Sequence, residues 1–261
     1  MNAARVLVVG GVISFRALFN WLTPWIYVPV LLVVPATEVF FFVYVGRAAH
    51  LESDRFYVIG NAVQQTALPC LFAMVNTLAG ERRSQTLSTL LGTPANRLAL
   101  YFSRALPVIA NGFLVSAFAF LVGSLVFGVR PAPGGWPLLA LCVLVAAFSS
   151  TGLGLVCGAF GLRGRDVAVL GNLVGVLLLL FCGANVPLAS LPGWMRTIAQ
   201  GLPLTHGIEA ARKAAAGAAA HDTVHLLLVE LAVGAVYATV GLLLLRFLET
   251  DARRRATLDI M

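Results

Sequence analysis

Two carboxylates stand inside long apolar stretches of the chain, where a charged group is costly. Glu38 lies in the stretch Trp25–Val45, and Glu230 lies in the stretch Thr223–Leu248. A carboxylate inside a bilayer costs on the order of 3 kcal/mol, so such residues are expected to face the protein interior or water. Each carboxylate can bind a cationic ligand group or line a polar path. Alternatively, each can pair with a Thr, an Asn or a backbone group of a neighbouring helix.

Amide side chains recur at helical spacing along a second apolar stretch, which also contains Pro69. They are Asn61, Gln64, Gln65 and Asn76. A polar stripe of this kind can line a path or form hydrogen bonds between helices worth roughly 1 kcal/mol each. We expect packing around a partly wetted cavity, with a helix kink at the proline.

His206 is the histidine that stands within a sequence motif, close to Thr205, Glu209 and Arg212. A histidine that acts as a general base needs a nucleophile within hydrogen-bond reach. The sequence Ser149-Ser150-Thr151-Gly152 is not the Gly-x-Ser-x-Gly turn of serine hydrolases, so intramembrane proteolysis fits poorly. We expect instead that a short helix begins here, with Thr205 as its N-cap and Glu209 on the same face one turn later. The residues that brace this helix are then Thr205, His206, Glu209 and Arg212.

The composition places the chain in a membrane. Of its 261 residues, 59% are hydrophobic and 11% are charged, and the mean hydropathy is +0.91. A water-soluble domain carries roughly a quarter charged residues. Six apolar stretches each approach the roughly 20 residues needed to cross a hydrocarbon core of about 30 Å. They are Trp25–Val45, Phe56–Ala79, Tyr101–Phe127, Trp136–Leu162, Val167–Pro187 and Thr223–Leu248. We therefore predict an all-α membrane protein with six transmembrane helices in one domain, residues 1–261.

The placement of basic residues predicts the orientation of these helices. The formal net charge is +7, but the charges divide between the two sides. The richer set is Arg5, Arg16, Arg82, Arg83, Arg97, Arg104, Arg163, Arg165, Arg246, Arg253, Arg254 and Arg255. The poorer set is Arg47, Arg55, Arg130, Arg196, Arg212 and Lys213. The richer side is the cytoplasmic one by the positive-inside rule, which leaves both termini in the cytoplasm.

The basic charge is therefore a topology signal with a minor role in binding anionic membrane lipid, and no nucleic-acid partner is expected. The preference for Arg over Lys, together with many Ala and Gly residues, indicates the codon bias of a GC-rich bacterium, and the expected location is a bacterial plasma membrane. All four cysteines lie in predicted spans without metal-ligand spacing, and we expect them to be small core residues rather than a metal site. They are Cys70, Cys142, Cys157 and Cys182.

Two segments outside the spans are apolar enough to contact the membrane. Residues 1–21 are predicted to form a helix in the cytoplasmic interface, although a simple extension of the first span is an alternative. Residues 187–221 are too polar and proline-broken to span. We expect two short helices in the outer leaflet there, the first starting at Pro192 with Trp194 at its beginning, and the second starting at Pro203 or Thr205. Broken backbone at membrane depth must pack on protein or line a cavity, so this segment is predicted to cap a route through the membrane.

A polar segment, residues 81–97, separates the second and third apolar stretches. Charged residues come first, an amphipathic turn with leucines follows, and Thr93-Pro94 ends it. A short helix with a leucine stripe needs an apolar groove on the membrane domain or on another protein. The alternative is a solvated loop whose leucines pack on neighbouring spans. The positions expected to touch a partner are Glu81, Arg82, Arg83, Thr86, Leu87, Leu90, Leu91, Thr93 and Pro94.

Two of these stretches resemble a known family, the membrane subunits of type-2 ATP-binding-cassette exporters. The first is Glu81-Arg82-x-x-x-Thr86-Leu87-x-x-Leu90-Leu91-x-Thr93-Pro94, which is similar to the cytoplasmic coupling helix of that family. The second runs from Leu191-Pro192-Gly193-Trp194 to Arg212 and is similar to the external segment before the last span. The resemblance covers essentially the whole chain. It departs from the family pattern at Arg83, Gln85 and Ser88, which makes this loop more basic than usual.

The resemblance implies a non-catalytic permease subunit that is driven by a separate ATPase. The sequence has no Gly-x-x-x-x-Gly-Lys-Ser/Thr loop for ATP phosphates, so ATP and Mg²⁺ are expected on two copies of a partner ATPase subunit and no cofactor is expected on this chain. A second permease protomer, identical or paralogous, would complete the pathway. The expected cargo is an amphiphilic small molecule such as an antibiotic or a lipid-like metabolite. The alternatives are a lipid-linked glycan and, in a different class, a membrane enzyme or an assembly factor.

Overall fold

The computed structural model describes residue 25 and residues 29–83, 97–161 and 167–254. Within these ranges all regular secondary structure is helical. The elements are η1 (Pro29–Val33), α3 (Val34–Ala49), α4 (Asp54–Gln64), α5 (Ala67–Arg83), α7 (Arg97–Phe127), α8 (Gly135–Gly161), α9 (Val167–Phe181), η2 (Leu188–Ser190), α10 (Gly193–Gly201), α11 (Thr205–Ala216) and α12 (Ala220–Arg254). The predicted interfacial helix at residues 1–21 lies outside the described residues, as do residues 84–96 of the predicted coupling segment.

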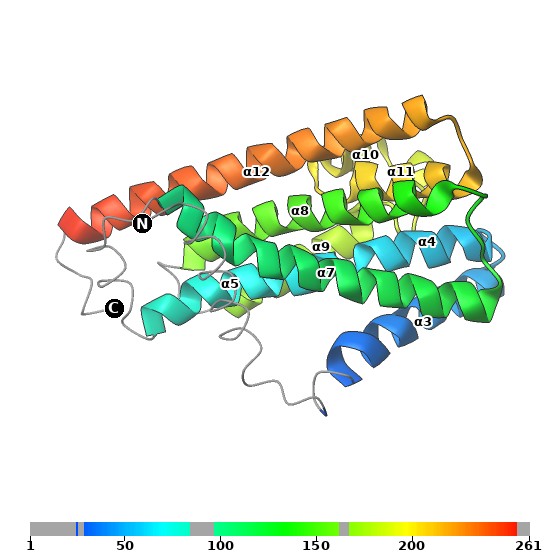
Figure 1. Ribbon diagram of the computed structural model, residues 1–261, viewed down its shortest axis with the longest axis horizontal. Helices are drawn as coiled ribbons and strands as arrows, with labels where there is room; N and C mark the ends of the chain where they lie inside the picture. Colours follow the sequence, from blue (N-terminus) through cyan, green and yellow to red (C-terminus); the bar gives the residue numbers. More distant parts are fainter. Residues whose placement is uncertain (1–24, 26–28, 84–96, 162–166, 255–261) are drawn as a thin grey trace.

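The long helices run side by side in a bundle, and the short helices α10 and α11 lie at one of its ends (Figure 1). The α3–α4 and α7–α8 connections reach the same end, because Ala132 donates its backbone N–H to the Ala215 carbonyl at 3.0 Å and Arg55 hydrogen-bonds the same carbonyl. We call this end of the bundle the cap end. Helix α5 finishes at Arg83 at the opposite end (Figure 1).

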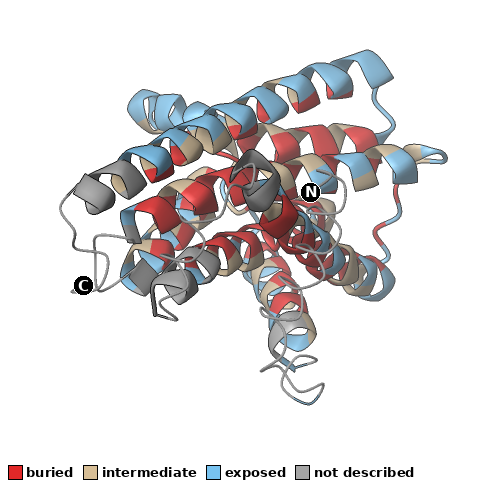
Figure 2. Ribbon diagram, turned by 60° about the vertical axis from the view of Figure 1, so that its left-hand side comes forward, coloured by how far each residue is buried: buried red, intermediate tan, exposed pale blue. Residues whose placement is uncertain are grey.

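Helix α8 lies at the centre of the bundle and packs against α5, α7, α9, α11 and α12. It contains no charged residue, and small residues recur along it. A helix that is apolar on all faces is buried by its neighbours. The buried residues gather where the long helices face one another, whereas the outward faces are exposed (Figure 2). This outward apolar surface is the part that a bilayer would cover.

The contact between α8 and α12 depends on two glycines. A Cβ atom added to Gly152 would lie 2.8 Å from the Gly234 carbonyl oxygen, and one added to Gly234 would lie 2.8 Å from the Ser149 Cα atom. Both distances are shorter than real Cβ contacts. Small residues allow two membrane helices to approach until their backbones touch. The two helices are therefore held at a separation that excludes larger side chains at this crossing.

Four helices in the described ranges are long and apolar enough to cross a membrane: Asp54–Asn76, Phe102–Phe127, Gly135–Phe160 and Ala220–Leu248. They match four of the six predicted spans. The other two predicted spans contain shorter helices. Helix α3 has 16 residues and α9 has 15, and at about 1.5 Å per residue each extends less than the roughly 30 Å of a hydrocarbon core. The count of six spans therefore stays a prediction.

The second predicted span is kinked where the sequence suggested. Helix α4 ends at Gln64 and α5 begins at Ala67. Pro69 lacks the N–H that would bond the Gln65 carbonyl in a continuous helix. The Thr66 hydroxyl turns back to donate to the Val63 carbonyl at 2.9 Å, which satisfies a backbone group at the break.

We expect that Gly152→Ala destabilises the bundle by about 1 to 3 kcal/mol, the usual cost of overpacking a filled core. The added methyl group must push the α12 backbone away from α8. Thermal unfolding of the detergent-purified protein measures the effect. Gly193→Ala is the matched control, because no atom lies within 4 Å of the added carbon there. Equal unfolding temperatures for the two variants would contradict close backbone packing of α8 on α12.

Candidate functional site

Glu230 is fully buried in α12, with 0% of its surface exposed. Its carboxylate accepts hydrogen bonds from the backbone N–H of Leu204 at 2.7 Å and of Gly207 at 3.0 Å. The Ser149 hydroxyl of α8 donates to the same carboxylate. One side chain thus joins α8, α11 and α12. An ionised carboxylate only accepts hydrogen bonds, and all three of these neighbours offer donors.

The carboxylate also caps the N-terminus of α11. The first turn of a helix has backbone N–H groups without an intrahelical partner and a partial positive charge. Glu230 accepts hydrogen bonds from two of these N–H groups, and its carboxylate lies at the positive end of the helix. Thr205 was expected to be the N-cap, but this prediction is wrong. The helix begins at Thr205, its N-cap is Leu204, and the Thr205 hydroxyl instead donates to the Ala199 carbonyl at 2.7 Å. Because a residue on another helix supplies the cap, no local side chain is needed.

Leu204 pays a conformational cost for this arrangement. It has a φ of 77°, in the left-handed region that a branched side chain rarely adopts. Its side chain is completely buried, and its N–H points to Glu230. Burial of the leucine side chain and the charge-assisted hydrogen bond offset the strain.

Two arginines hold the other end of α11. Arg55 of α4 donates to the Ala215 carbonyl in the last turn, where the helix carries partial negative charge. Arg212 donates to the carbonyls of Gly183 at 2.9 Å, Ala184 at 3.0 Å and Phe56 at 3.2 Å, and its guanidinium lies 3.5 Å from the centre of the Phe56 ring. Burial lowers the pKa of Arg212 to about 10, so it remains charged at neutral pH. Helix α11 is therefore fixed by a carboxylate at its start and by guanidinium groups towards its end.

The remaining predicted cap residues lie at the start of α10, in the α10–α11 connection and in α11. Helix α10 begins directly after Pro192, and Trp194 is 62% exposed, as expected for an aromatic residue at a membrane interface. His206 contacts the Gln200 carbonyl through Nε2 at 3.0 Å, which joins α11 to α10. Pro203 is buried. Glu209 forms an exposed ion pair with Lys213 at 3.4 Å, a contact worth little in stability.

Glu38 is partly buried, and its partner is Gln65, one of the four amide residues of the predicted polar stripe. Gln65 donates its amide to the Glu38 carboxylate at 2.8 Å, which joins α3 to the α4–α5 break. Asn61 donates to the Tyr57 carbonyl of its own helix at 2.9 Å, and Gln64 is buried. Asn76 is exposed. The four amides therefore do not form one continuous polar wall. Glu38 and Gln65 are brought together, whereas Glu230 belongs to the separate cluster around α11.

A further polar contact at the cap end was not predicted. The Arg47 guanidinium donates to the Asp54 carboxylate at 2.9 Å across the α3–α4 turn, and it lies 5.2 Å from the centre of the Phe127 ring. This cluster holds α3, α4 and α7 together at one point. The sequence gives only a weak signal for it, since Arg47 and Asp54 are seven positions apart in a short connection.

The described part of the chain contains no group of three His, Cys, Asp or Glu side chains placed to hold a metal ion. The four cysteines are buried and unpaired with each other. Around Glu230 the neighbours are backbone amides and one serine hydroxyl, so the carboxylate acts here as a structural acceptor. This geometry favours the interhelical pairing interpretation for both Glu38 and Glu230 in the conformation described.

The sequence matches the family described as ABC-2 type transporter over residues 34–215. This range covers well over half of the chain, from the start of α3 to the last turn of α11. The chain therefore belongs to the ABC-2 type transporter family and is a permease subunit of this type. A comparison with curated proteins gives no match. Together with four helices of membrane-crossing length, the family match makes this chain a multi-pass membrane component of an ABC transporter, and membership implies an ABC ATPase partner.

We expect that Glu230→Ala lowers the unfolding free energy by about 2 to 4 kcal/mol, because it leaves the buried N–H groups of Leu204 and Gly207 without an acceptor. Glu230→Gln keeps one acceptor oxygen and should cost roughly half as much. Thermal unfolding in detergent measures both variants. Glu209→Ala serves as the control, because it removes an exposed carboxylate from α11 and should change stability by less than about 1 kcal/mol. If Glu230→Ala were no less stable than this control, Glu230 would not be the anchor of α11.

Proposed function

We propose that this chain is the membrane-spanning subunit of an ATP-driven exporter that moves an amphiphilic small molecule out of the cytoplasm or the inner leaflet. The observation that carries the proposal is the ABC-2 family match over residues 34–215 in a chain with four helices of membrane-crossing length. Export, rather than import, follows from the resemblance of the sequence to type-2 exporters.

The described connections support a small cargo. The α3–α4 connection comprises residues 50–53, and the α7–α8 connection comprises residues 128–134. Neither is long enough for a folded carbohydrate-binding domain. The surfaces facing outwards from α7 and α12 are apolar, with Leu125 and Val236 among their exposed side chains. A molecule with both apolar and polar parts can approach this protein from the bilayer.

The energy is proposed to come from two copies of a separate ATPase subunit. The chain has no phosphate-binding Gly-x-x-x-x-Gly-Lys-Ser/Thr loop. Residues 81–97 would dock in a cleft of the ATPase, and closure of the ATPase pair on nucleotide would rock the attached helices. A second permease protomer, identical or paralogous, completes the pathway in this proposal.

Leu90→Asp should uncouple transport from ATP hydrolysis. An aspartate cannot enter an apolar cleft, and removal of one buried leucine contact costs about 1.5 to 3 kcal/mol, so we expect transport to fall at least about tenfold. The measurement is ATP-dependent cargo movement in proteoliposomes that contain the permease and its ATPase, with membrane insertion checked separately.

The matched control is Leu51→Asp. Leu51 is 70% exposed in the α3–α4 connection at the cap end, so the same chemical change is made at the end of the bundle away from the proposed ATPase site. It should leave transport unchanged. Normal transport by Leu90→Asp, or equal losses in both variants, would count against the coupling proposal.

The nearest alternative cargo is a lipid-linked glycan. Stimulation of ATP hydrolysis in the purified complex distinguishes the two: a panel of amphiphilic antibiotics should stimulate the activity, whereas polyprenyl-linked sugars should not. The alternative from a different functional class is a membrane enzyme or an assembly factor. If this alternative holds, no nucleotide-binding subunit should copurify with the protein. Copurification is therefore the first experiment to perform.

A further inference from the structure

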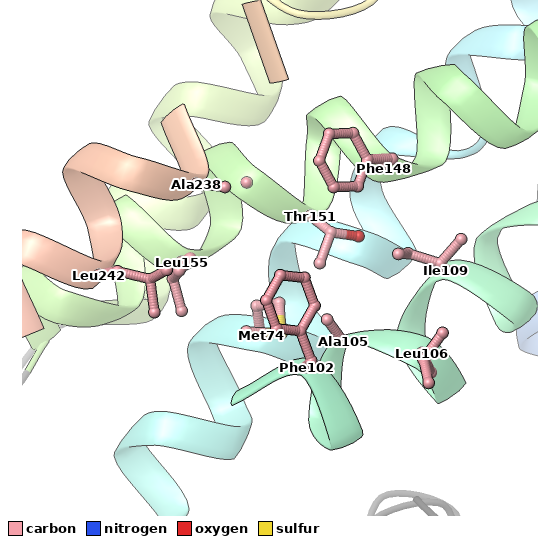
Figure 3. Close-up of a pocket in the computed structure, with 11 residues that line it drawn as sticks. Met74, Phe102, Ala105, Leu106, Ile109, Phe148, Thr151, Leu155, Ala238 and Leu242 are labelled. Atoms are coloured by element: carbon pink, nitrogen blue, oxygen red, sulfur yellow. The ribbon is translucent and has the colours of Figure 1, made fainter. Parts of the chain in front are cut away.

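An apolar cavity of about 190 Å³ lies within the bundle, between α5, α7, α8 and α12. Side chains from these four helices converge on it, with the rings of Phe102 and Phe148 on opposite sides of Thr151 (Figure 3). Apart from Thr151, the lining offers only hydrocarbon and one methionine sulfur. The Thr151 hydroxyl donates to the Ala147 carbonyl of its own helix at 2.7 Å. The hydroxyl proton of the lining therefore already has an acceptor, and the cavity suits a hydrocarbon.

The cavity arises from the way in which the four helices pack. Helix α12 packs mainly on α8 and α11, whereas α7 packs mainly on α5, α8 and α4. The glycine contact at Gly152 draws α12 close to α8, and α12 does not close against α7. A groove is left between α7 and α12, with α8 and α5 as its floor. Phe102 and Leu106 at its α7 edge are 51% and 54% exposed.

The volume and length of the cavity are sufficient for part of a hydrocarbon chain. Dry apolar cavities of about 150 Å³ already take up benzene, so the volume is sufficient for a ligand. The lining runs from Phe102 to Ile109 on α7 and from Phe148 to Leu155 on α8. Seven residue steps at 1.5 Å each give a length of about 10 Å along the helices. The chains of bilayer lipids run in this direction, parallel to transmembrane helices.

The surroundings of the groove are those of a lipid-facing surface. Only 44% of the apolar window of α7 and 22% of that of α12 are buried within the protein. Both helices belong to an ABC-2 permease, in which surfaces of membrane-crossing helices meet lipid. We propose that this cavity is a binding site for one acyl chain of a bilayer lipid, which enters between α7 and α12. This proposal requires only that the protein spans the membrane. It does not depend on which cargo the protein exports.

Photolabelling tests the site directly. The full chain, with any subunit that copurifies, is placed in nanodiscs of phosphatidylcholine that carries a diazirine in one acyl chain. After illumination, mass spectrometry locates the label. We expect label on Met74, Thr151 and Leu155, which are 1%, 3% and 6% exposed and which lipid outside the cavity cannot reach. Label restricted to exposed side chains such as Phe102 and Leu106 would overturn the proposal, since it is the result for ordinary boundary lipid or for a cavity covered by protein.

Two variants fill the cavity from opposite walls. Ala105→Leu acts from α7 and Ala238→Leu acts from α12. If a leucine displaces about two methylenes of the lipid chain at about 0.8 kcal/mol each, labelling of the buried residues falls by roughly tenfold. Ala110→Leu is the control, because it makes the same change at an exposed position of α7 outside the cavity, and it should not alter labelling.

If Ala105→Leu does not fold, Ala238→Leu decides the question. Unchanged labelling of Met74, Thr151 and Leu155 in a folded filling variant would overturn the site. The readout involves neither ATP hydrolysis nor transport, so a negative result here leaves the proposed export function untouched. A failed transport assay would likewise leave the lipid site standing.

Discussion

The contact between the Glu230 carboxylate and the N-terminus of α11 is the constraint on which the cap end depends. A buried carboxylate in an apolar helix is stabilised only when donors surround it, and a helix that starts inside a protein needs acceptors for its first N–H groups. The N–H groups of α11 supply donors to the Glu230 carboxylate, and the carboxylate supplies acceptors to these N–H groups. This mutual need explains why Leu204 tolerates a left-handed backbone. It also explains why α11 remains in place although it is too short to be stable alone.

In the middle of the bundle, small residues hold the helices together by allowing close backbone contact. Gly152 and Gly234 let α8 and α12 touch through their backbones, and this places Ser149 within reach of Glu230. The buried polar cluster around Glu230 therefore depends on the close approach of α8 and α12. Where the approach is less close, between α12 and α7, the apolar cavity remains. Hydrocarbon suits this gap, because the one polar side chain in its lining, Thr151, already donates its hydroxyl to the Ala147 carbonyl of its own helix.

Much of the fold could be predicted from apolar length alone. The stretches that became α7, α8 and α12 are continuous, and the kink at Pro69 follows from the missing N–H. The two shorter stretches were harder, because residue composition does not say how far a helix extends before its ends turn away. The resemblance carried by Glu81–Pro94 and Leu191–Arg212 indicated the correct family. The contacts of residues 84–96 lie outside the described part of the chain, so the coupling helix remains a prediction.

The partners of the candidate site residues were mostly beyond sequence reasoning. Glu230 is 81 positions from Ser149, and its other two partners are backbone N–H groups, which leave no trace in residue type. Thr205 has a strong preference for the N-cap position, but a distant carboxylate took that role. Arg212 was expected to brace α11, and its three carbonyl acceptors show how it does so. Arg55, which appeared only as a topology marker, turned out to hold the same helix.

The attachment of α11 at both of its ends has a mechanical consequence. Its N-terminus is tied to α12 through Glu230, and its C-terminal half is tied to α4 and to the residues after α9 through Arg55 and Arg212. A tilt of α12 at the far end of the bundle cannot be absorbed by a loose loop. Because α11 is hydrogen-bonded at both ends, a tilt of α12 would displace α4 and the residues after α9 as well.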